Sequence, residues 1–361
     1  MSKTVQRLET KESIDERTQQ VLRGIIEGYI TSNEPVGSRS LSKSLEMGLS
    51  PATIRNIMSD LSDMGFLMQL HTSAGRIPTD KAYRFYVDQV VVANQLTRKL
   101  QKKIQEATQE GGINQVEDLL ISTTRLLAGL TQFVCLTSSP RVETSILRRI
   151  EFIRLSSQQI LVVLVTRNGQ VRNKIIATTE DLSQDFLNTV SSFLNEQFHN
   201  RNLHEIRQQI LESMVEDKER YDRLLAQAVR LGKKAFELED APEVYIEGQH
   251  NLIFSERFRN LNSSRGLMDA FEHKSMIMNL LDSTVEADGI QIFIGIENEL
   301  ESLQDCTMVK AQYSDQNNVL GTIGVIGPTN MDYQTVIPVV DFTARILSQT
   351  ITQQSSSCDW K

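Results

Sequence analysis

The stretch of sequence that decides the fold is residues 48–80, GLSPATIRNIMSDLSDMGFLMQLHTSAGRIPTD. Ser50 can cap a helix that begins at Pro51, because a serine hydroxyl accepts a backbone N–H of the first turn and proline suits the first helical position. Apolar side chains then recur at helical spacing and predict one inward face: Ile54, Ile57, Met58 and Leu61. Gly65 stands where a left-handed backbone commonly ends a helix. The segment therefore predicts a helix over residues 51–64.

Two shorter helical patterns precede this helix. Residues 15–31 predict a first helix with one apolar face, formed by Val21, Leu22, Ile25, Ile26 and Tyr29. After a turn at residues 35–37, Ser38 can cap a second short helix. Gly48 can take a positive φ at little steric cost and makes the tight turn into the third helix. A helix, a glycine turn and a capped helix in this order form a helix-turn-helix pattern.

The outward face of the third helix carries side chains that read the edges of DNA bases. Arginine offers paired donors to guanine, asparagine forms two hydrogen bonds with adenine, and alanine or threonine methyl groups contact the thymine methyl. The N-terminus of this helix and the Ser50 hydroxyl can also receive a phosphate. The residues of the second and third helices predicted to contact DNA are Ser38, Arg39, Ser50, Ala52, Thr53, Arg55, Asn56 and Ser59.

Residues 66–80 predict a β-hairpin that follows the helix-turn-helix as a wing. One strand leads to a tip at residues 72–75, and the return strand ends at Pro78. The residues near the tip that are predicted to touch the DNA backbone or the minor groove are His71, Thr72, Ser73 and Arg76. From Val36 to Arg84 there are six basic and four acidic residues. This small excess predicts modest non-specific affinity and a need for a dimer.

The rest of the chain predicts an α+β multidomain protein. Strands are expected at 132–136, 147–155, 159–166, 171–177, 244–247, 290–296, 307–311 and 319–326, and helices at 115–130, 181–240, 266–281 and 332–350. Asn168-Gly169 is a strong hairpin signal between two of these strands. We expect four parts: residues 1–95 as a winged helix-turn-helix, 96–113 as a helical linker, 114–180 with 282–350 as one discontinuous α/β-sheet domain, and 181–281 as a mainly helical insertion.

The inserted segment is expected to form a dimer contact. Its charged helices have no obvious core of their own, and a second copy of the chain would supply one. The apolar residues predicted to lie in that contact are Leu267, Met268, Phe271, Met276 and Leu280.

The composition excludes several classes of protein. The chain has 361 residues, a formal net charge of −8, 40% hydrophobic and 23% charged residues. These values are ordinary for a folded protein and argue against a basic coat protein or a disordered chain. Cys135, Cys306 and Cys358 lie far apart, as in a chain without a disulfide framework or zinc site. Without an apolar leader or a stretch long enough to span a bilayer, the protein is expected to be cytoplasmic.

The sequence predicts neither catalysis nor a bound cofactor or metal. Gly321, Gly324 and Gly327 lack the order and the following lysine of a phosphate-binding loop, so they predict a core strand that turns at Gly327-Pro328. His199 and His204 are not spaced as metal ligands and are expected on a helix surface. The sequence also lacks a nucleophile elbow and a triad-like arrangement.

Two long runs resemble the HrcA family of heat-inducible transcription repressors. The first lies within residues 34–88, from EPVGSRSL to YRFYVD, and the second is residues 321–349, GTIGVIGPTNMDYQTVIPVVDFTARILSQ. The resemblance implies a dimeric repressor with a winged helix, a GAF-like domain and an inserted dimerisation domain. It also implies an inverted-repeat operator of the CIRCE type upstream of chaperone operons, and activity maintained by the GroE chaperonin. Ile57, where many members have an acidic residue, and Asn330, where a basic residue is common, depart from the family pattern.

Other functions stay open at this point. The GAF-like domain suggests a ligand-responsive regulator, in which that domain senses an effector. An interaction protein that mainly binds a chaperonin, or an enzyme with a winged-helix appendage, are further alternatives. Binding to an inverted repeat but not to scrambled DNA, without added substrate, would distinguish the repressor from the interaction protein and from the enzyme.

Overall fold

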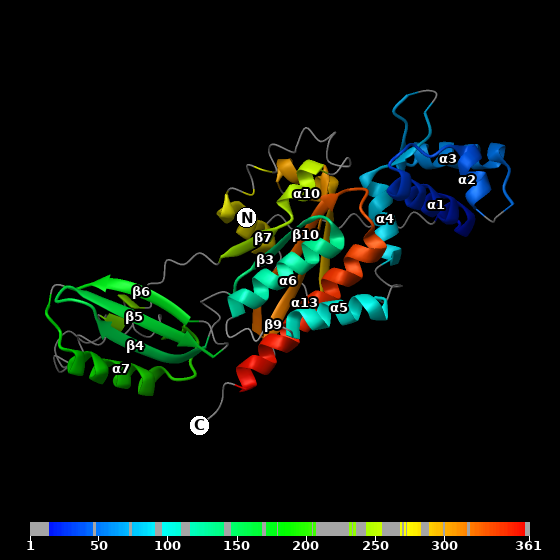
Figure 1. Cartoon of the computed structure of the whole chain (residues 1–361). Helices are drawn as coiled ribbons and strands as arrows, with labels where there is room; N and C mark the ends of the chain where they lie inside the picture. The colour runs from blue at the N-terminus through cyan, green and yellow to red at the C-terminus, as the bar shows by residue number, and fades with distance from the viewer. Residues whose placement is uncertain are drawn as a thin grey trace.

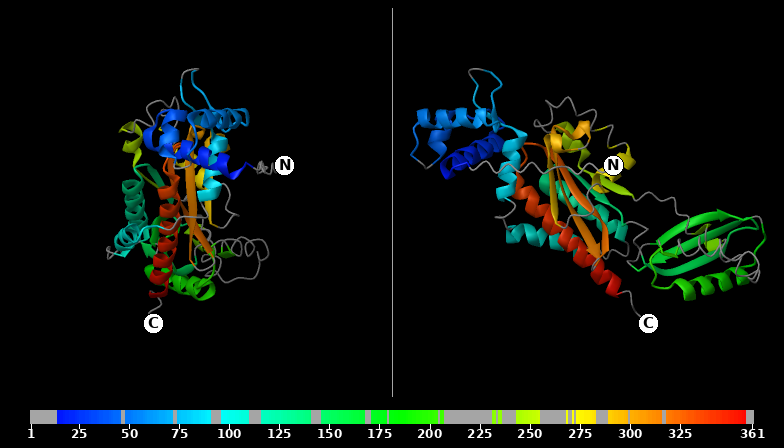
Figure 2. Two further views of the ribbon diagram at one scale, coloured as in Figure 1. Left: turned by 90° about the vertical axis from the view of Figure 1, so that its right-hand side faces the viewer. Right: turned by 180° about the vertical axis from the view of Figure 1, so that it is seen from behind.

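The structure consists of three units that lie in a row (Figures 1 and 2). The computed structural model describes residues 14–45, 48–71, 74–90, 96–109, 116–140, 146–167, 171–178, 180–203, 205–206, 231–232, 234–235, 243–254, 268, 271, 273–282, 289–298, 300–315 and 318–357. We call the part from residue 14 to 90 the N-terminal unit, the five-stranded sheet with its helices the central unit, and the three-stranded sheet with its helix the peripheral unit. The mixed α+β class predicted from the sequence is confirmed.

The N-terminal unit is a bundle of short helices with one hairpin. Its elements are α1 (Glu16–Ser32), α2 (Ser38–Ser44), α3 (Pro51–Asp63), β1 (Leu67–Met68), β2 (Ile77–Pro78) and α4 (Asp80–Val90). The apolar face predicted for the first helix is buried, with Val21, Leu22, Ile25 and Ile26 fully covered. The strands β1 and β2 pair in an antiparallel hairpin. In Figure 1 the hairpin projects away from α1, α2 and α3.

The central unit is built on an antiparallel sheet whose strands come from distant parts of the chain. The strand order is β7 (Val244–Glu247), β3 (Val134–Ser138), β10 (Asn318–Pro328), β9 (Cys306–Asp315) and β8 (Ile290–Ile294). All five residues of β3 are buried, as expected for a strand covered on both faces. Thr137 of β3 pairs with Ile323 of β10.

Helices cover this sheet. The helix α6 (Val116–Thr131) packs against β3 and β7, and α13 (Tyr333–Ser357) packs against β9 and β10. The helix α5 (Arg98–Gln109) lies in the predicted linker, yet it packs against α6 and α13 and buries Ile104 completely. The short helix α10 (Gln249–Phe254) contacts β3. Two 3₁₀ turns, η2 (Gly295–Glu297) and η3 (Glu301–Leu303), connect β8 to β9.

The glycines of the second run resembling the family serve packing, as predicted. A Cβ atom at Gly321 would lie 2.6 Å from the Tyr313 hydroxyl, and one at Gly327 would lie 3.1 Å from the Phe133 ring. Side chains at these positions would push β10 away from its neighbours. The strand continues through Pro328, so the turn comes just after the predicted Gly327-Pro328.

The peripheral unit departs from the predicted domain boundaries. The strands β4 (Leu147–Arg154), β5 (Gln159–Thr166) and β6 (Val171–Ala177) were expected in the same sheet as β3, but they form a separate antiparallel sheet. The helix α7 (Gln184–Phe198) packs on one face of it. The predicted turn residues Asn168 and Gly169 lie outside the described residues.

This unit has its own hydrophobic core. Ile150, Phe152, Val162 and Leu164 from the sheet meet Leu187, Val190 and Leu194 from α7. The inserted segment therefore begins before β4 and is only partly helical, and its core does not depend on another chain. At the other end, β7 and α12 (Lys274–Asp282), placed in the insertion by sequence, belong to the central unit.

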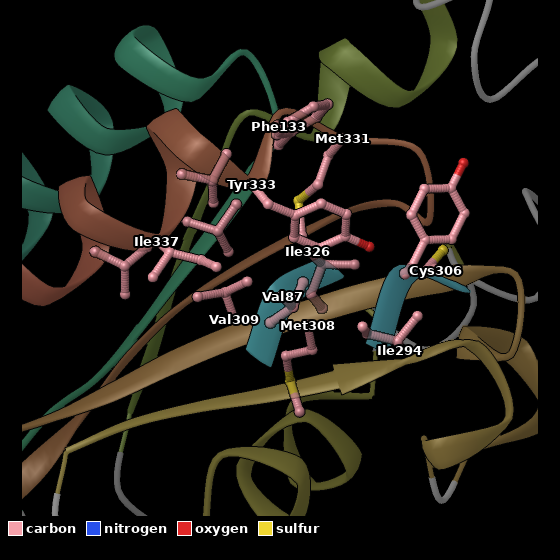
Figure 3. Close-up of a cluster of buried hydrophobic side chains, with 14 of the residues drawn as sticks. Val87, Phe133, Ile294, Cys306, Met308, Val309, Ile326, Met331, Tyr333 and Ile337 are labelled. Atoms are coloured by element: carbon pink, nitrogen blue, oxygen red, sulfur yellow. The ribbon is translucent and has the colours of Figure 1, made fainter. Parts of the chain in front are cut away.

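The N-terminal and central units share one continuous apolar core. Val87 of α4 is fully buried, and it lies among side chains of the central sheet that include Ile294, Met308 and Tyr333 (Figure 3). The ring of Tyr83, also from α4, lies 5.9 Å from that of Tyr333 between centroids. The last helix of the N-terminal unit is thus anchored in the central unit by apolar burial.

Candidate nucleic-acid interface

The helix α3 begins and ends as its sequence predicts. The Ser50 hydroxyl accepts a hydrogen bond from the Thr53 backbone N–H at 3.1 Å, and Pro51 is the first helical residue. At the other end Gly65 has a φ of +77°, and the Phe66 N–H donates to the Leu61 carbonyl at 2.9 Å. This arrangement satisfies backbone groups that would otherwise be unpaired at the end of the helix. Both ends of α3 are therefore fixed locally.

One face of α3 is buried and the opposite face is open. Ile54, Met58 and Leu61 lie in the core, and Ile57 is half-buried against it. Four of the five α3 side chains predicted to read bases are exposed: Ala52, Arg55, Asn56 and Ser59. The fifth, Thr53, is half-buried. The Thr53 hydroxyl lies 2.9 Å from the Ser50 hydroxyl. The open face thus presents one guanidinium, one amide, hydroxyls and a methyl group.

The helix α2 supports α3 and differs from the prediction at its start. Gly37, rather than Ser38, precedes the first helical residue, and no side-chain hydrogen bond caps the helix. Ser38 is 9% exposed and so lies against the core, whereas Arg39 is exposed. The turn between α2 and α3 uses Gly48, whose φ is +64°, as predicted. We correct the assignment of Ser38 as a cap, and its buried side chain is not available to DNA.

The return arm of the hairpin is bridged to the segment before α2. The backbone of Arg76 exchanges two hydrogen bonds of 2.9 Å with Val36. Gly75 is required next to this pair, since a Cβ there would lie 2.5 Å from the Val36 carbonyl oxygen. Arg76 lies between the predicted tip and β2, where it is bridged to Val36 and half-buried. His71 is exposed, while Thr72 and Ser73 lie outside the described residues.

The residues predicted to form a dimer contact are placed elsewhere. Phe271 is 5% exposed and Leu280 is 4% exposed, and both lie in the core shared by the N-terminal and central units. Met268 is partly buried against the same core. Met276 is exposed, and Leu267 lies outside the described residues. This apolar segment fills the interior of a single chain, so its hydrophobicity does not indicate an interface.

The described residues offer little reactive chemistry. They contain no group of three or more histidine, cysteine or acidic side chains placed to hold a metal ion. His199 Nδ1 lies 3.1 Å from the Arg148 carbonyl oxygen at the end of α7, and His204 lies outside the described part. Cys135 and Cys306 are buried free thiols, and burial raises the pKa of each to about 12. Both thiols therefore stay protonated near neutral pH; Cys358 lies outside the described residues.

Sequence reasoning missed the side chains that join the N-terminal unit to the central unit. Asp80 and Arg84 of α4 bind Ile296 and Glu297, which follow β8. Tyr86 of α4 binds Gln334 of α13. The spacing of Asp80, Arg84 and Val87 places them on one face of a helix, but the partners lie more than 200 residues away. Local sequence gave no signal that would have identified them.

Comparisons with known proteins identify the family. The family model described as "HrcA protein C terminal domain" matches residues 117–337. A heat-inducible transcription repressor HrcA from Geobacter sulfurreducens is 40% identical over 338 residues, which cover 94% of this chain and 98% of that protein. The protein of the same name from Syntrophobacter fumaroxidans is 39% identical over 340 residues, covering 94% and 97%.

A solved structure supports the fold. The crystal structure of a hypothetical protein matches with a TM-score of 0.65 and 24% identity, over 94% of this chain and 99% of that one. None of the helices in the described part of the chain has the length and apolarity needed to cross a membrane. The family model covers residues 117–337, whereas the relatives match nearly the whole length of the chain. The function that these relatives share is the negative regulation of heat-shock genes. The chain therefore belongs to the HrcA family of heat-inducible transcription repressors.

Proposed function

We propose that this protein represses chaperone operons in the cytoplasm by binding, as a homodimer, an inverted-repeat operator of the CIRCE type in double-stranded DNA. The observation that carries the proposal is the open face of α3, where Arg55 and Asn56 are exposed on a helix fixed at both ends. In this proposal α3 enters the major groove, and the hairpin of β1 and β2 lies beside it as a wing. The bound dimer blocks transcription.

The proposal is tested by titrating the full chain against two DNA duplexes, one with the inverted repeat and one with the same bases scrambled. No ligand is added. A repressor of this type binds the repeat at least about 1,000-fold more tightly at physiological salt. Equal affinity for both duplexes would contradict sequence-specific repression. Specific binding that appears only after a small molecule is supplied would instead favour the ligand-responsive regulator with a GAF-like sensor domain.

The outer face of the peripheral sheet is the surface we assign to the dimer contact. The run from Ile160 to Val165 is apolar at every position, as in a strand covered on both faces, yet it alternates between buried and half-buried residues. On the face away from α7, Ile153, Leu161 and Ile175 lie side by side across the three strands. Ile153 is 40% exposed and Ile175 is 57% exposed.

A second copy of the same sheet would cover this apolar row. Val171 at 55% exposure extends it along β6, and Val165 is its neighbour on β5. Closed dimers form through a patch that is complementary to itself. On this face the apolar side chains lie beside Asn173 and the Arg149–Glu151 ion pair, so a second copy would bury apolar residues with polar groups next to them. The unit that carries the face lies at the opposite end of the molecule from α3 (Figure 1). This position leaves the DNA-binding helices free in a dimer.

We expect Ile175→Asp to dissociate the dimer, because two-fold symmetry places two charges in the apolar contact. Sedimentation equilibrium of the full chain should show a dimer dissociation constant raised at least about tenfold. Met276→Asp is the matched control, since Met276 is also an exposed apolar residue, at 45%, on a helix of the central unit. It should leave the dimer intact. If Met276→Asp dissociates the dimer and Ile175→Asp does not, the dimer contact lies in the segment around Met276 that the sequence predicted.

The family resemblance adds the GroE chaperonin as a regulatory partner. The central sheet pairs β3 with β10, so this pairing can form only after the whole intervening chain has been made. Such non-local pairing folds slowly and exposes apolar surface on the way. The repressor is thus a suitable client for a chaperonin, and the supply of free chaperonin would set the amount of active repressor.

Added GroE chaperonin is therefore expected to raise the fraction of the protein able to bind operator, several-fold at constant temperature. An excess of an unrelated unfolded protein should lower that fraction again by competing for the chaperonin. The active fraction is measured by titrating a fixed amount of protein with operator well above the dissociation constant. A purified protein that is fully active and indifferent to both additions would rule out this mechanism.

A further inference from the structure

The Arg84 side chain connects the N-terminal unit to the free edge of the central sheet. Its Nε donates to the Glu297 Oε1 at 2.9 Å, and its Nη2 donates to Glu297 Oε2 and to the Ile292 carbonyl at 2.6 Å. Glu297 in turn accepts the Ile294 N–H at 2.8 Å. Because β8 is the last strand of the sheet, this ion pair occupies backbone groups of an edge strand.

This ion pair is partly shielded from solvent. Burial lowers the pKa of Arg84, but the hydrogen bond and charge of Glu297, together with the charges of Asp88 and Tyr333, raise that pKa by more. Asp88, one turn later on α4, lies 3.7 Å from Arg84 Nη1. The side chain of Arg84 is 30% exposed and that of Glu297 is 36% exposed. Because the pair is bidentate, it fixes the orientation of the Arg84 guanidinium relative to the Glu297 carboxylate as well as the distance between them.

Asp80, one turn before Arg84, makes a second contact with the same turn. Its Oδ2 accepts the Ile296 N–H at 3.2 Å. Gly295 has a φ of +55°, and a Cβ there would overlap the Asp80 carboxylate. Burial, with Glu297 and Asp305 nearby, raises the pKa of Asp80 although the hydrogen bond from Ile296 lowers it. The turn η2 is therefore shaped to receive the start of α4.

Polar contacts on a further side of α4 complete the attachment. The Tyr86 hydroxyl accepts a hydrogen bond from Gln334 Nε2 at 2.7 Å, and the same amide donates to Glu27 of α1 at 3.1 Å. Nearby, Asn330 Nδ2 donates to the Asn33 Oδ1 at 2.7 Å, just after α1. These bonds, with the buried Val87 between them and the Arg84 pair, hold α4 in one orientation.

We propose that Arg84 and Glu297 are positioning residues for operator recognition: they fix the direction in which each subunit presents α3, and thereby the distance and phase at which two half-sites are read. The inference rests on the proposed dimeric binding to an inverted repeat. Neither residue lies on the exposed face of α3. A rigid attachment raises the effective concentration of the second α3 at the second half-site, so it strengthens two-site binding without changing one-site binding.

The test compares Glu297→Ala with the unmodified chain on two DNA duplexes, the full inverted repeat and a single half-site. Half-site affinity should stay within about twofold, whereas affinity for the full repeat should fall about tenfold. Glu297→Gln keeps a side-chain oxygen that can accept from Arg84 or from the Ile294 N–H, so it should lose less affinity for the full repeat than Glu297→Ala. Asp341→Ala, which removes an exposed pair with Arg345 on α13, should change neither affinity. Equal loss on both duplexes, or no loss on either, would overturn the positioning role.

A measurement without DNA separates this inference from the proposed dimeric function. Spin labels are placed at Lys43→Cys on α2 and Gln349→Cys on α13, both exposed positions, in a chain carrying Cys358→Ser. Labelled protein is diluted about tenfold with unlabelled protein, so that distances within one subunit dominate. The distance distribution should be narrow, and should broaden in Glu297→Ala. An unchanged distribution would overturn the inference, whatever the DNA titrations show. If the unmodified chain does not prefer the full repeat to the half-site, the proposed dimeric binding is wrong. The spin-label distances then test by themselves whether Arg84 and Glu297 fix the orientation of the N-terminal unit.

Discussion

Inserting about five base pairs between the half-sites of the inverted repeat should weaken binding by at least about 100-fold. One turn of B-DNA contains about 10–10.5 base pairs, so this insertion rotates one half-site to the opposite side of the duplex. A dimer whose two α3 helices are held in fixed directions can then engage only one half-site, and it loses the contribution of the second. The shared core around Val87 makes large reorientation of α3 costly. Affinity is measured by fluorescence anisotropy at one fixed salt concentration.

The matched control is an insertion of about ten base pairs, which restores the phase but increases the distance. It should recover part of the affinity if the dimer tolerates the added length, and it should not bind more weakly than the five-base-pair insertion. Affinity that is unchanged by the shorter insertion would mean that a single subunit binds alone. That result would contradict the dimeric part of the proposal while leaving the role of α3 untouched.

Replacing Arg55 by alanine should cost roughly 1–3 kcal/mol of operator binding, about 5- to 150-fold in affinity. Arg55 is exposed on α3, and a guanidinium that forms two hydrogen bonds with guanine discriminates against other bases. The loss should therefore be larger on operator than on scrambled DNA. Preference at one base position should also relax, which is read out with a set of operators that each carry a single base change.

Arg39→Ala is the matched comparison, because Arg39 is an exposed arginine on α2. If it contacts phosphate, its loss should weaken operator and scrambled DNA alike and reduce the dependence of binding on salt by about one unit of slope. A variant Arg55→Ala that keeps the original ratio of operator to scrambled affinity would show that Arg55 does not read bases.

Helices and strands whose ends are set by residues adjacent in the sequence could be predicted from the sequence. The helix α3 starts at Pro51 and ends before Gly65, since Ser50 and Gly65 satisfy its ends without help from the rest of the protein. The strands β5 and β6 have the predicted bounds. A continuous apolar run marks β5, and the Asn168-Gly169 turn signal separates it from β6. The exposed face of α3 also follows from helical spacing alone.

Features that depend on distant residues could not be predicted. The patterns of β4 and β5 do not specify which sheet these strands join. They form a separate sheet, and α7 covers one face of it. Arg76 is bridged by two backbone hydrogen bonds to Val36, forty residues earlier. In the sequence, Phe271 and Leu280 have the apolar character of interface residues, but in the structure they are buried in the core of the chain. The partners of Arg84 follow from tertiary structure alone.

Footprinting of the full chain on the promoter of its own chaperonin operon tests the central claim most directly. The account predicts protection of two half-sites related by an inverted repeat, on the same face of the duplex and at the same protein concentration. Arg55→Ala should abolish protection of both at that concentration. Protection of one half-site without the other, or uniform weak protection along the promoter, would contradict it.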